Sequence, residues 1–415
     1  CTLPVAGVTS WDDGAHSWAG DGHEWYHAAW GRSAGLPAAS GGGLLLPPRP
    51  GDLARGDRVV VRHWIYHGNA VDFGGRGNAD IHLEDVTVVS APGHAFVGYG
   101  CDRGVRLTRC AIARGPQDLV SATADGCHVG ACAGDVIIED CDFAHQGDDS
   151  VNIHGVWMRV AEVVGSAVSL TSRWLDHARQ QVARGHRLAF FREGTLEPLG
   201  ERVIQAIASG PDALTVTLDR GIPGVEAGAF VADRARGTDR FRITGNHFHD
   251  HRARGMLIQA RDGLIAGNRV ERVQMAGLNL TTDCAFWQEG YGCADVLVSG
   301  NHFLSCNQHR RERGPRGVHL ACVNVLVETP DGIGTHPLHE RIALVGNVIE
   351  DTAGPAMLVA SSRQVAVVGN RVARAQRAPL PDAGSAIGLP AAGHAALVHG
   401  PGTAEVCWLG NHVED

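Results

Sequence analysis

The chain has 415 residues, of which 55 are glycine, and it contains no lysine, so all 36 basic residues are arginine. Against 45 acidic residues this gives a formal net charge of −9. Such a chain lacks the basic surface that nucleic acid or an anionic membrane requires, and we expect neither as a partner. No apolar run approaches the roughly 18 residues of a membrane-spanning helix. The hydrophobic content of 44% permits a large core, and the glycine excess favours turns and short strands over helices.

The first 55 residues stand before any repeat of the chain. They contain four tryptophans and a proline- and glycine-rich stretch, LLLPPRPGD. Where strands stack into a long repeat fold, the open end exposes unpaired backbone and invites aggregation. We therefore predict that residues 1–55 form an N-terminal cap.

One phrase recurs in residues 56–155 and again in residues 240–415: an alternating apolar tetrapeptide, a turn and an apolar pair. In the second part the turn is Gly-Asn, as in FRITGNHF, and successive asparagines are 22, 33, 46, 23 and 41 residues apart. A unit of 22 to 24 residues, with loops in two places, explains these spacings and predicts a right-handed parallel β-helix, an all-β solenoid. Its turns would stack the asparagines in a ladder: Asn246, Asn268, Asn301, Asn347, Asn370 and Asn411.

The repeat is interrupted once. Cys141 and Asn246 take the same position in successive turns but are 105 residues apart, roughly 80 more than one turn requires. The excess contains its own alternating segments, including MRVAEVV, HRLAFFRE and LTVTLD. We predict that residues 156–239 form a small β-barrel or sandwich inserted into the β-helix.

Three carboxylates gather just before this insertion. Asp125 and Asp149 are 24 residues apart, which is one turn, Asp148 is adjacent, and Arg254 takes the equivalent position in the next turn. Like charges this close raise at least one pKa, so one carboxyl stays protonated while an arginine keeps another ionised. Glycoside hydrolysis needs such an acid and base. A bound Ca²⁺ or aspartates that merely form turns would also explain the cluster.

The motif QGDDSVNIHG, with TADGCHV upstream, resembles the catalytic strands of β-helical glycoside hydrolases. Polygalacturonases are distantly similar, but Ala124 stands where their asparagine would be, and their Arg-Ile-Lys motif is absent. Glycoside hydrolase family 110, the exo-α-1,3-galactosidases, is more similar over nearly the whole chain. That resemblance includes GDRVVVRH at 56–63, the aspartates, the insertion, RARGMLI and the WQEG loop at 287–290.

The resemblance implies an inverting exo-glycosidase that removes terminal α-1,3-linked galactose from oligosaccharides, of the blood-group B or the linear type, without metal or organic cofactor. Asp148 would be the general acid, and Asp125 and Asp149 would share the attacking water as general base. Eight other side chains near the motif or in the following turns are candidate substrate-binding residues: Asn152, Asn279, His128, His154, Arg252, Arg254, Trp287 and Glu289.

Two alternatives remain open. A polygalacturonase-like hydrolase of another α-galactoside or a uronide would share the fold, although an anionic substrate fits poorly with a chain that has no lysine. A non-catalytic carbohydrate-binding β-helix would not need stacked carboxylates. In each case the expected partner is an oligosaccharide, and a homo-oligomer is compatible with the sequence.

The 11 cysteines match no zinc signature. Small buried hydrophobic side chains are the favoured interpretation, with Cys127–Cys132 and Cys284–Cys293 as candidate bridges. No signal peptide is visible, but the predicted substrate favours a secreted or periplasmic location.

Overall fold

The computed structural model describes residues 58–414 except 64–65, 67, 285, 309–320 and 377–395. Within residues 1–57 it gives only the bounds and pairing of five strands, so the predicted cap lies outside the fully described residues. Strand β2 pairs antiparallel with β6. The bounds are β1 (Thr2–Val5), β2 (Gly7–Asp12), β3 (Ser17–Trp18), β4 (Glu24–His27), β5 (Ala34–Pro37) and β6 (Val59–Arg62).

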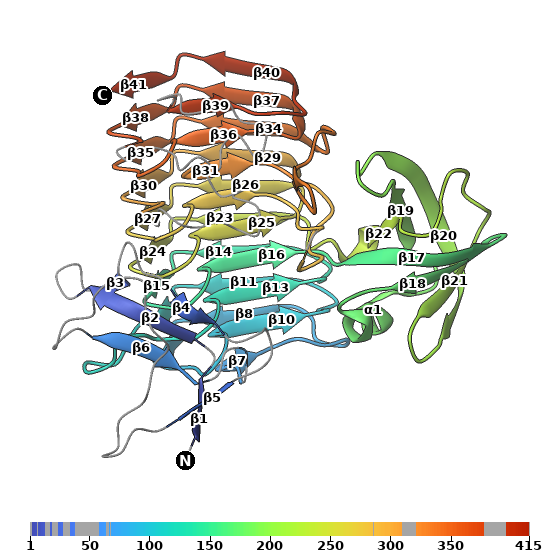
Figure 1. Cartoon of the computed structure of the whole chain (residues 1–415), viewed down its shortest axis with the longest axis horizontal. Coiled ribbons are helices and arrows are strands. Elements are labelled where there is room, and N and C mark those ends of the chain that lie inside the picture. The colour runs from blue at the N-terminus through green and yellow to red at the C-terminus, as the bar shows by residue number, and fades with distance from the viewer. Residues whose placement is uncertain are drawn as a thin grey trace.

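Three parallel sheets of nine strands form the body of the molecule, and each turn of the chain adds one strand to each sheet (Figure 1). The first sheet contains β7 (Val71–Asp72), β10 (Phe96–Tyr99), β13 (Cys127–Gly130), β16 (Val151–His154), β25 (Met256–Gln259), β28 (Leu278–Leu280), β31 (Val323–Val325), β36 (Met357–Val359) and β39 (Leu397–His399). The predicted parallel β-helix is therefore confirmed.

The second sheet contains β8 (Ile81–Glu84), β11 (Val105–Thr108), β14 (Val136–Glu139), β23 (Phe241–Thr244), β26 (Gly263–Ala266), β29 (Ala294–Ser299), β34 (His339–Val345), β37 (Ser362–Val368) and β40 (Ala404–Leu409). The third contains β9 (Thr87–Val88), β12 (Ala111–Ile112), β15 (Asp142–Ala144), β24 (His247–His249), β27 (Arg269–Glu271), β30 (His302–Leu304), β35 (Val348–Glu350), β38 (Arg371–Ala373) and β41 (His412–Glu414).

The core runs along the axis between the sheets because each strand alternates inward apolar and outward polar side chains. In β11, for example, Val105 and Leu107 are buried and Arg106 is exposed. Phenylalanines at equivalent positions also stack: the ring centroids of Phe143 and Phe248 are 5.6 Å apart. Burial of such a continuous apolar column is the main force that stabilises the stack.

The repeated Gly-Asn marks the sharp corner between the second and third sheets. The residue before each ladder asparagine lies in the left-handed region, as at Gly245 with φ 68°, where glycine carries no Cβ penalty. In the earlier turns Asp85, Arg109 and Asp140 adopt this conformation. Every ladder asparagine except the last, Asn411, is buried, and its side chain bonds to the next turn: Asn246 Nδ2 donates to Asn268 Oδ1 at 2.9 Å.

The insertion is a closed six-stranded barrel beside the β-helix (Figure 1). It has a core of its own that includes Leu170, Phe190 and Val216. Strand β14, before the insertion, pairs directly with β23, after it, so the solenoid continues without a gap. The barrel contains β17 (Trp157–Val164), β18 (Ala167–Thr171), α1 (Leu175–Gln181), β19 (Arg187–Phe191), β20 (Pro198–Ser209), β21 (Leu214–Leu218) and β22 (Phe230–Asp233), followed by a 3₁₀ turn, η1 (Arg234–Arg236).

The remaining elements are a two-stranded hairpin, β32 (Glu328–Thr329) and β33 (Gly332–Ile333). No helix in the described part of the chain is long and apolar enough to cross a membrane. The bridges considered for Cys127–Cys132 and Cys284–Cys293 are wrong, because all four side chains are free and buried. They pack as small hydrophobic groups.

Candidate active site

A cavity of about 440 Å³ lies over the first sheet, in the range of sites that hold small ligands. It covers the strands β13, β16 and β25, and the barrel and the loop before β29 complete its wall. Nine of the eleven predicted site residues line it: Asp125, Asp148, Asp149, His128, Asn152, Arg252, Arg254, Trp287 and Glu289.

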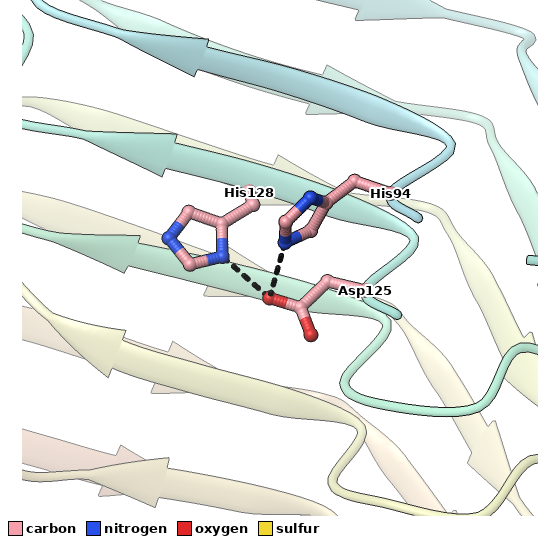
Figure 2. A group of neighbouring side chains, drawn as sticks. All are labelled: His94, Asp125 and His128. Atoms are coloured by element: carbon pink, nitrogen blue, oxygen red, sulfur yellow. Dashed lines mark hydrogen bonds and ion pairs between the residues drawn. The ribbon is translucent and has the colours of Figure 1, made fainter. Parts of the chain in front are cut away.

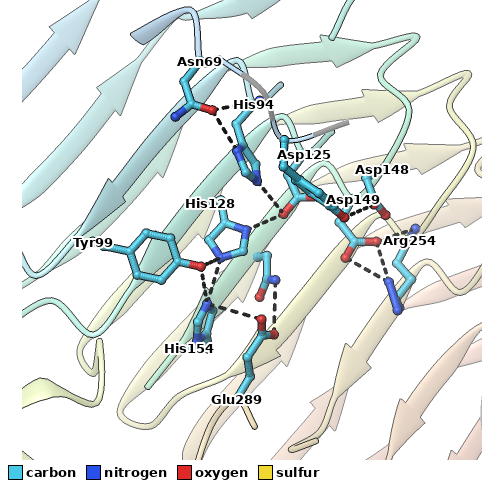
Figure 3. A network of polar contacts seen from close by, with 12 residues as sticks. Asn69, His94, Tyr99, Asp125, His128, Asp148, Asp149, His154, Arg254 and Glu289 are labelled. Carbon is cyan, nitrogen blue, oxygen red and sulfur yellow. Dashed lines mark hydrogen bonds and ion pairs between the residues drawn. The ribbon is translucent and has the colours of Figure 1, made fainter. Parts of the chain in front are cut away.

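The three aspartates meet as the repeat predicts. Cys127 pairs with Val151 and Val151 with Met256, so the residues two positions earlier, Asp125, Asp149 and Arg254, stack on consecutive turns. One oxygen from each of Asp125, Asp148 and Asp149 lies within 4.8 Å of the others. We call these three residues the carboxyl trio (Figure 3).

Glycine is required immediately before the aspartate pair. A Cβ on Gly147 would lie 2.5 Å from the backbone oxygen of Thr123 in the preceding turn, which no side chain tolerates. The close approach of these two loops presses the aspartates of successive turns together. The Gly-Asp-Asp sequence is therefore a packing requirement as well as a chemical one.

The partners of the trio differ between its members. Arg254 Nη1 lies 2.9 Å from each carboxylate oxygen of Asp149, and its backbone N–H also donates to Asp149. Asp148 accepts a hydrogen bond of 2.8 Å from Tyr66 Oη, and the guanidinium of Arg252 lies 3.8 Å away. Both arginine contacts place positive charge at the same edge of the cavity.

These surroundings shift the three carboxyl groups in opposite directions. Burial raises the pKa of Asp125 well above its ordinary value, and the charge of Asp148 adds to the effect. Burial also raises the pKa of Asp149 to about 8 despite the opposing charge of Arg254. Burial alone would raise the pKa of Asp148, but Arg252, Arg254 and the Tyr66 hydrogen bond lower it. Such opposed shifts are typical of acid–base sites.

Histidines surround Asp125. His128 Nδ1 lies 2.5 Å from Asp125 Oδ2, and His94 Nε2 lies 4.0 Å from the same oxygen (Figure 2). Burial lowers the pKa of both imidazoles to about 3. Donors of these types at this spacing could hold a metal ion, as could the carboxyl trio itself.

The opposite wall combines an acid with aromatic rings. Glu289 is buried, and its Oε2 accepts a hydrogen bond of 2.8 Å from Gln259. Trp287 lies parallel to Trp174 of the insertion with ring centroids 6.4 Å apart. His177 of α1 lies 4.6 Å from the ring of Tyr99. The inserted barrel therefore supplies part of the cavity wall.

Two predicted substrate-binding residues do not line the cavity. His154 is buried behind His128. Asn279 is fully buried and accepts a hydrogen bond from Asn324 of the next turn, and Leu257 separates it from Asn152 in the stack. The structure therefore does not place these two side chains at the cavity wall, and their contact with substrate stays a prediction.

Eight residues that line the cavity were not among the predicted site residues: Arg62, Tyr66, His94, Tyr99, Trp174, His177, Leu257 and Met275. His94 had a usable signal, because it stacks one turn before Asp125. Trp174 and His177 had none of their own: the position of the insertion directly after the aspartates makes it a candidate to close the pocket, but the sequence does not indicate which of its residues reach the cavity.

Comparisons with known proteins agree with the family resemblance that the sequence motifs indicate. No protein-family model matches the chain. An α-1,3-galactosidase A from Streptomyces avermitilis is 29% identical over 272 residues, covering 62% of this chain and 42% of that protein. For α-1,3-galactosidase A from Bacteroides fragilis strain YCH46 the identity is 25% over 277 residues, with coverage of 65% and 45%. The predicted resemblance to the α-1,3-galactosidases is confirmed.

An α-1,3-galactosidase B from Bacteroides thetaiotaomicron matches at 26% identity over 243 residues, covering 55% of this chain and 37% of that relative. The chain thus spans less than half the length of these α-1,3-galactosidases. Among solved structures, the A-module of the mannuronan C-5 epimerase AlgE6 from Azotobacter vinelandii covers 81% of this chain and 58% of its own at 10% identity. Its TM-score of 0.39 is too low to inform function.

Proposed function

We propose that this protein is a glycoside hydrolase that removes terminal α-1,3-linked galactose from oligosaccharides. The observation that carries the proposal is the carboxyl trio, three carboxyl groups in one cavity with pKa values shifted in opposite directions. The names of the similar proteins support the substrate class.

Hydrolysis of a glycoside needs a proton for the leaving oxygen, a base for the attacking water and negative charge near the cationic sugar ring in the transition state. The trio can supply all three, because a raised pKa keeps one carboxyl protonated and a lowered pKa keeps another ionised. Around it, Asn152 and Glu289 offer hydrogen-bonding groups for hydroxyls, and Trp287 offers an apolar face for a sugar ring.

The resemblance gives Asp148 the role of acid and gives Asp125 and Asp149 the water, with inversion at the anomeric carbon. Because the pKa of Asp148 is lowered and those of Asp125 and Asp149 are raised, these roles require that a proton reach Asp148 when the substrate binds. Inverting enzymes usually separate acid and base by about 6.5 to 9.5 Å, whereas these oxygens lie within 4.8 Å. We therefore base inversion on the resemblance, with water held between Asp125 and Asp149 on the same side as the acid. Proton NMR of the first-formed galactose tests it, and retention of the α-anomer would contradict it.

The decisive experiment compares Asp148→Asn with the unaltered protein on an α-1,3-galactosyl disaccharide. We expect kcat to fall about 10³-fold or more, because general acid–base catalysis contributes up to about 10⁴. Asp140→Asn is the matched control: Asp140 is an exposed corner residue with φ 53°, a conformation that asparagine also adopts. Normal turnover by folded Asp148→Asn would refute the proposal.

An α-linked uronide is the rival substrate, because three arginines line the cavity: Arg62, Arg252 and Arg254. Four carboxyl groups line it as well, and Arg254 already pairs with Asp149. A neutral galactoside therefore fits the charge balance better. A parallel assay on a galacturonide of the same linkage separates the two, and faster turnover of the uronide would favour the rival. The same series, extended to a fucosylated branched acceptor, tests blood-group B type substrates.

A further inference from the structure

A chain of hydrogen bonds runs from the backbone to the carboxyl trio through two buried histidines (Figure 3). It begins at His154, whose Nδ1 lies 2.6 Å from the backbone oxygen of Gly155. A carbonyl oxygen can only accept a hydrogen bond, so Nδ1 carries the hydrogen. In a neutral imidazole the other nitrogen, Nε2, is then an acceptor.

The next link is His128, whose Nε2 lies 2.8 Å from Nε2 of His154. Two lone pairs at that distance repel, so one of the two nitrogens must carry a hydrogen. Because His154 already carries its hydrogen on Nδ1, His128 donates from Nε2. A neutral His128 then has no hydrogen on Nδ1, which lies 2.5 Å from Asp125 Oδ2.

The same reasoning applies to the last contact. A lone pair on His128 Nδ1 and a carboxylate oxygen would repel each other at 2.5 Å, so a hydrogen lies between them and comes from the carboxyl group. We propose that Asp125 is protonated when no substrate is bound, and that His154, acting through His128, is the positioning residue that keeps the proton there.

The electrostatics agree with this placement. Burial raises the pKa of Asp125, and Asp148 and Glu289 reinforce the shift. Burial lowers the pKa of His128 to about 3, so its ring is neutral. The other titratable or charged groups that face this chain are Tyr66 and His94 beside Asp125, Asp149 with Arg254 across the trio, and Tyr99 and His177 beside the histidines.

Two other proton arrangements have to be considered. Glu289 could stabilise a protonated His154, but its nearest oxygen is 3.7 Å from His154 Nε2, beyond a hydrogen bond. Tyr99 Oη lies 2.5 Å from His128 Nε2 and could donate to it, which would turn the Nδ1 hydrogen of His128 toward an ionised Asp125. That arrangement leaves the two facing Nε2 atoms without a hydrogen between them, so the structure disfavours it.

The inference deepens the proposed function and, for its catalytic meaning, rests on it. A protonated Asp125 cannot accept a proton from the attacking water. The roles implied by the resemblance then require that the proton pass from Asp125 to Asp148 within the trio when the sugar binds. Otherwise Asp125 itself is the donor to the glycosidic oxygen.

The test uses infrared difference spectroscopy and does not depend on activity. Subtracting the spectrum of Asp125→Asn from that of the unaltered protein at pH 7 should leave the carbonyl band of a protonated carboxylic acid. The subtraction is repeated in three backgrounds. In His154→Leu, which has no acceptor, the band should vanish. In His154→Gln, whose side-chain oxygen accepts a hydrogen bond, it should remain, and in Tyr99→Phe it should also remain.

Absence of the band in the unaltered protein overturns the proposal, and so does its loss in Tyr99→Phe, which would make Tyr99 the donor to His128. The His154→Gln and Tyr99→Phe variants keep the test decisive if His154→Leu does not fold. If the protein hydrolyses the disaccharide, the high-pH limb of kcat/KM should also move down by about one pH unit or more in His154→Leu but not in His154→Gln. Failure of hydrolysis with the band present would refute the function alone.

Discussion

Two columns of polar side chains run along the solenoid, and they differ in whether the stacked side chains can hydrogen-bond to one another. The asparagine ladder lies at the corner between the second and third sheets, where each buried amide donates to the oxygen of the next, as Asn268 does to Asn301 at 2.9 Å. The active-site column lies at the corner before the first sheet and stacks His94, Asp125, Asp149 and Arg254. Both columns use the spacing of one turn.

The difference is chemical. An amide has donors and an acceptor, so identical residues on successive turns satisfy one another and the column stabilises the fold. A carboxylate has no hydrogen to give, so stacked aspartates need an arginine or an added proton. A corner where the stacked side chains cannot satisfy one another, as they do in the asparagine ladder, is therefore a candidate functional site.

The largest effect should follow from removal of the cation in the active-site column. Arg254→Ala leaves Asp149 buried without its paired charge, which typically costs about 3 to 5 kcal/mol in the free energy of unfolding. Because the pKa of Asp149 is raised to about 8, we expect this cost at pH 9 and a smaller one at pH 5, where the carboxyl is protonated. Urea unfolding at both pH values measures it, and equal costs would contradict the assignment.

The asparagine ladder should respond strongly but without any dependence on pH. Asn301→Ala removes bonds to Asn268, Asn347 and the Ile265 carbonyl and leaves buried groups unsatisfied. We expect a loss of about 3 kcal/mol at both pH 5 and pH 9, since amides do not titrate. Asn411→Ala, at the half-buried end of the ladder, should cost only about 1 kcal/mol. Similar losses for the two variants would contradict the view that burial of the amide sets the cost.

The smallest effect concerns the proton itself. Asp125 has a raised pKa, so the folded protein binds more protons than the unfolded chain above the unfolded pKa of about 3.9. Its stabilising contribution is complete below that pH and declines as the pH rises. Asp125→Asn should lose this decline, so that the variant gains about 1 kcal/mol or more on the unaltered protein between pH 5 and pH 9. Parallel pH profiles for the two proteins would show that Asp125 is ionised throughout.

The fold was predictable because each turn of the β-helix is determined by a short sequence pattern that recurs along the chain. The period, the Gly-Asn corners and the 105-residue gap between Cys141 and Asn246 are visible in the sequence, and each corresponds to a structural feature. Counting along the repeat also aligned Asp125, Asp149 and Arg254, because residues that are one repeat apart in the sequence are neighbours in a solenoid.

The rest of the site is formed by a loop and by the insertion, which do not follow the repeat of the solenoid. Tyr66 and Trp174 reach the cavity from a loop and from the insertion, whose docking onto the solenoid follows from tertiary packing alone. Asn279, two turns after Asn152, lies outside the cavity because the cavity does not extend along the whole sheet, and it is buried against Asn324. His154 is on the same face of β16 as Asn152, but its ring is buried against His128 and the Gly155 carbonyl and does not line the cavity.

The barrel also determines when the site comes into existence. Asp149 and Arg254 are in contact but are 105 residues apart in the sequence, and most of the residues between them belong to the insertion. At synthesis rates of about 5 to 20 residues per second, Arg254 is synthesised roughly 5 to 20 s after Asp149. During that time the nascent turns end in an unpaired strand that carries adjacent negative charges, and those charges oppose edge-to-edge association until the barrel has folded and the next turn closes over them.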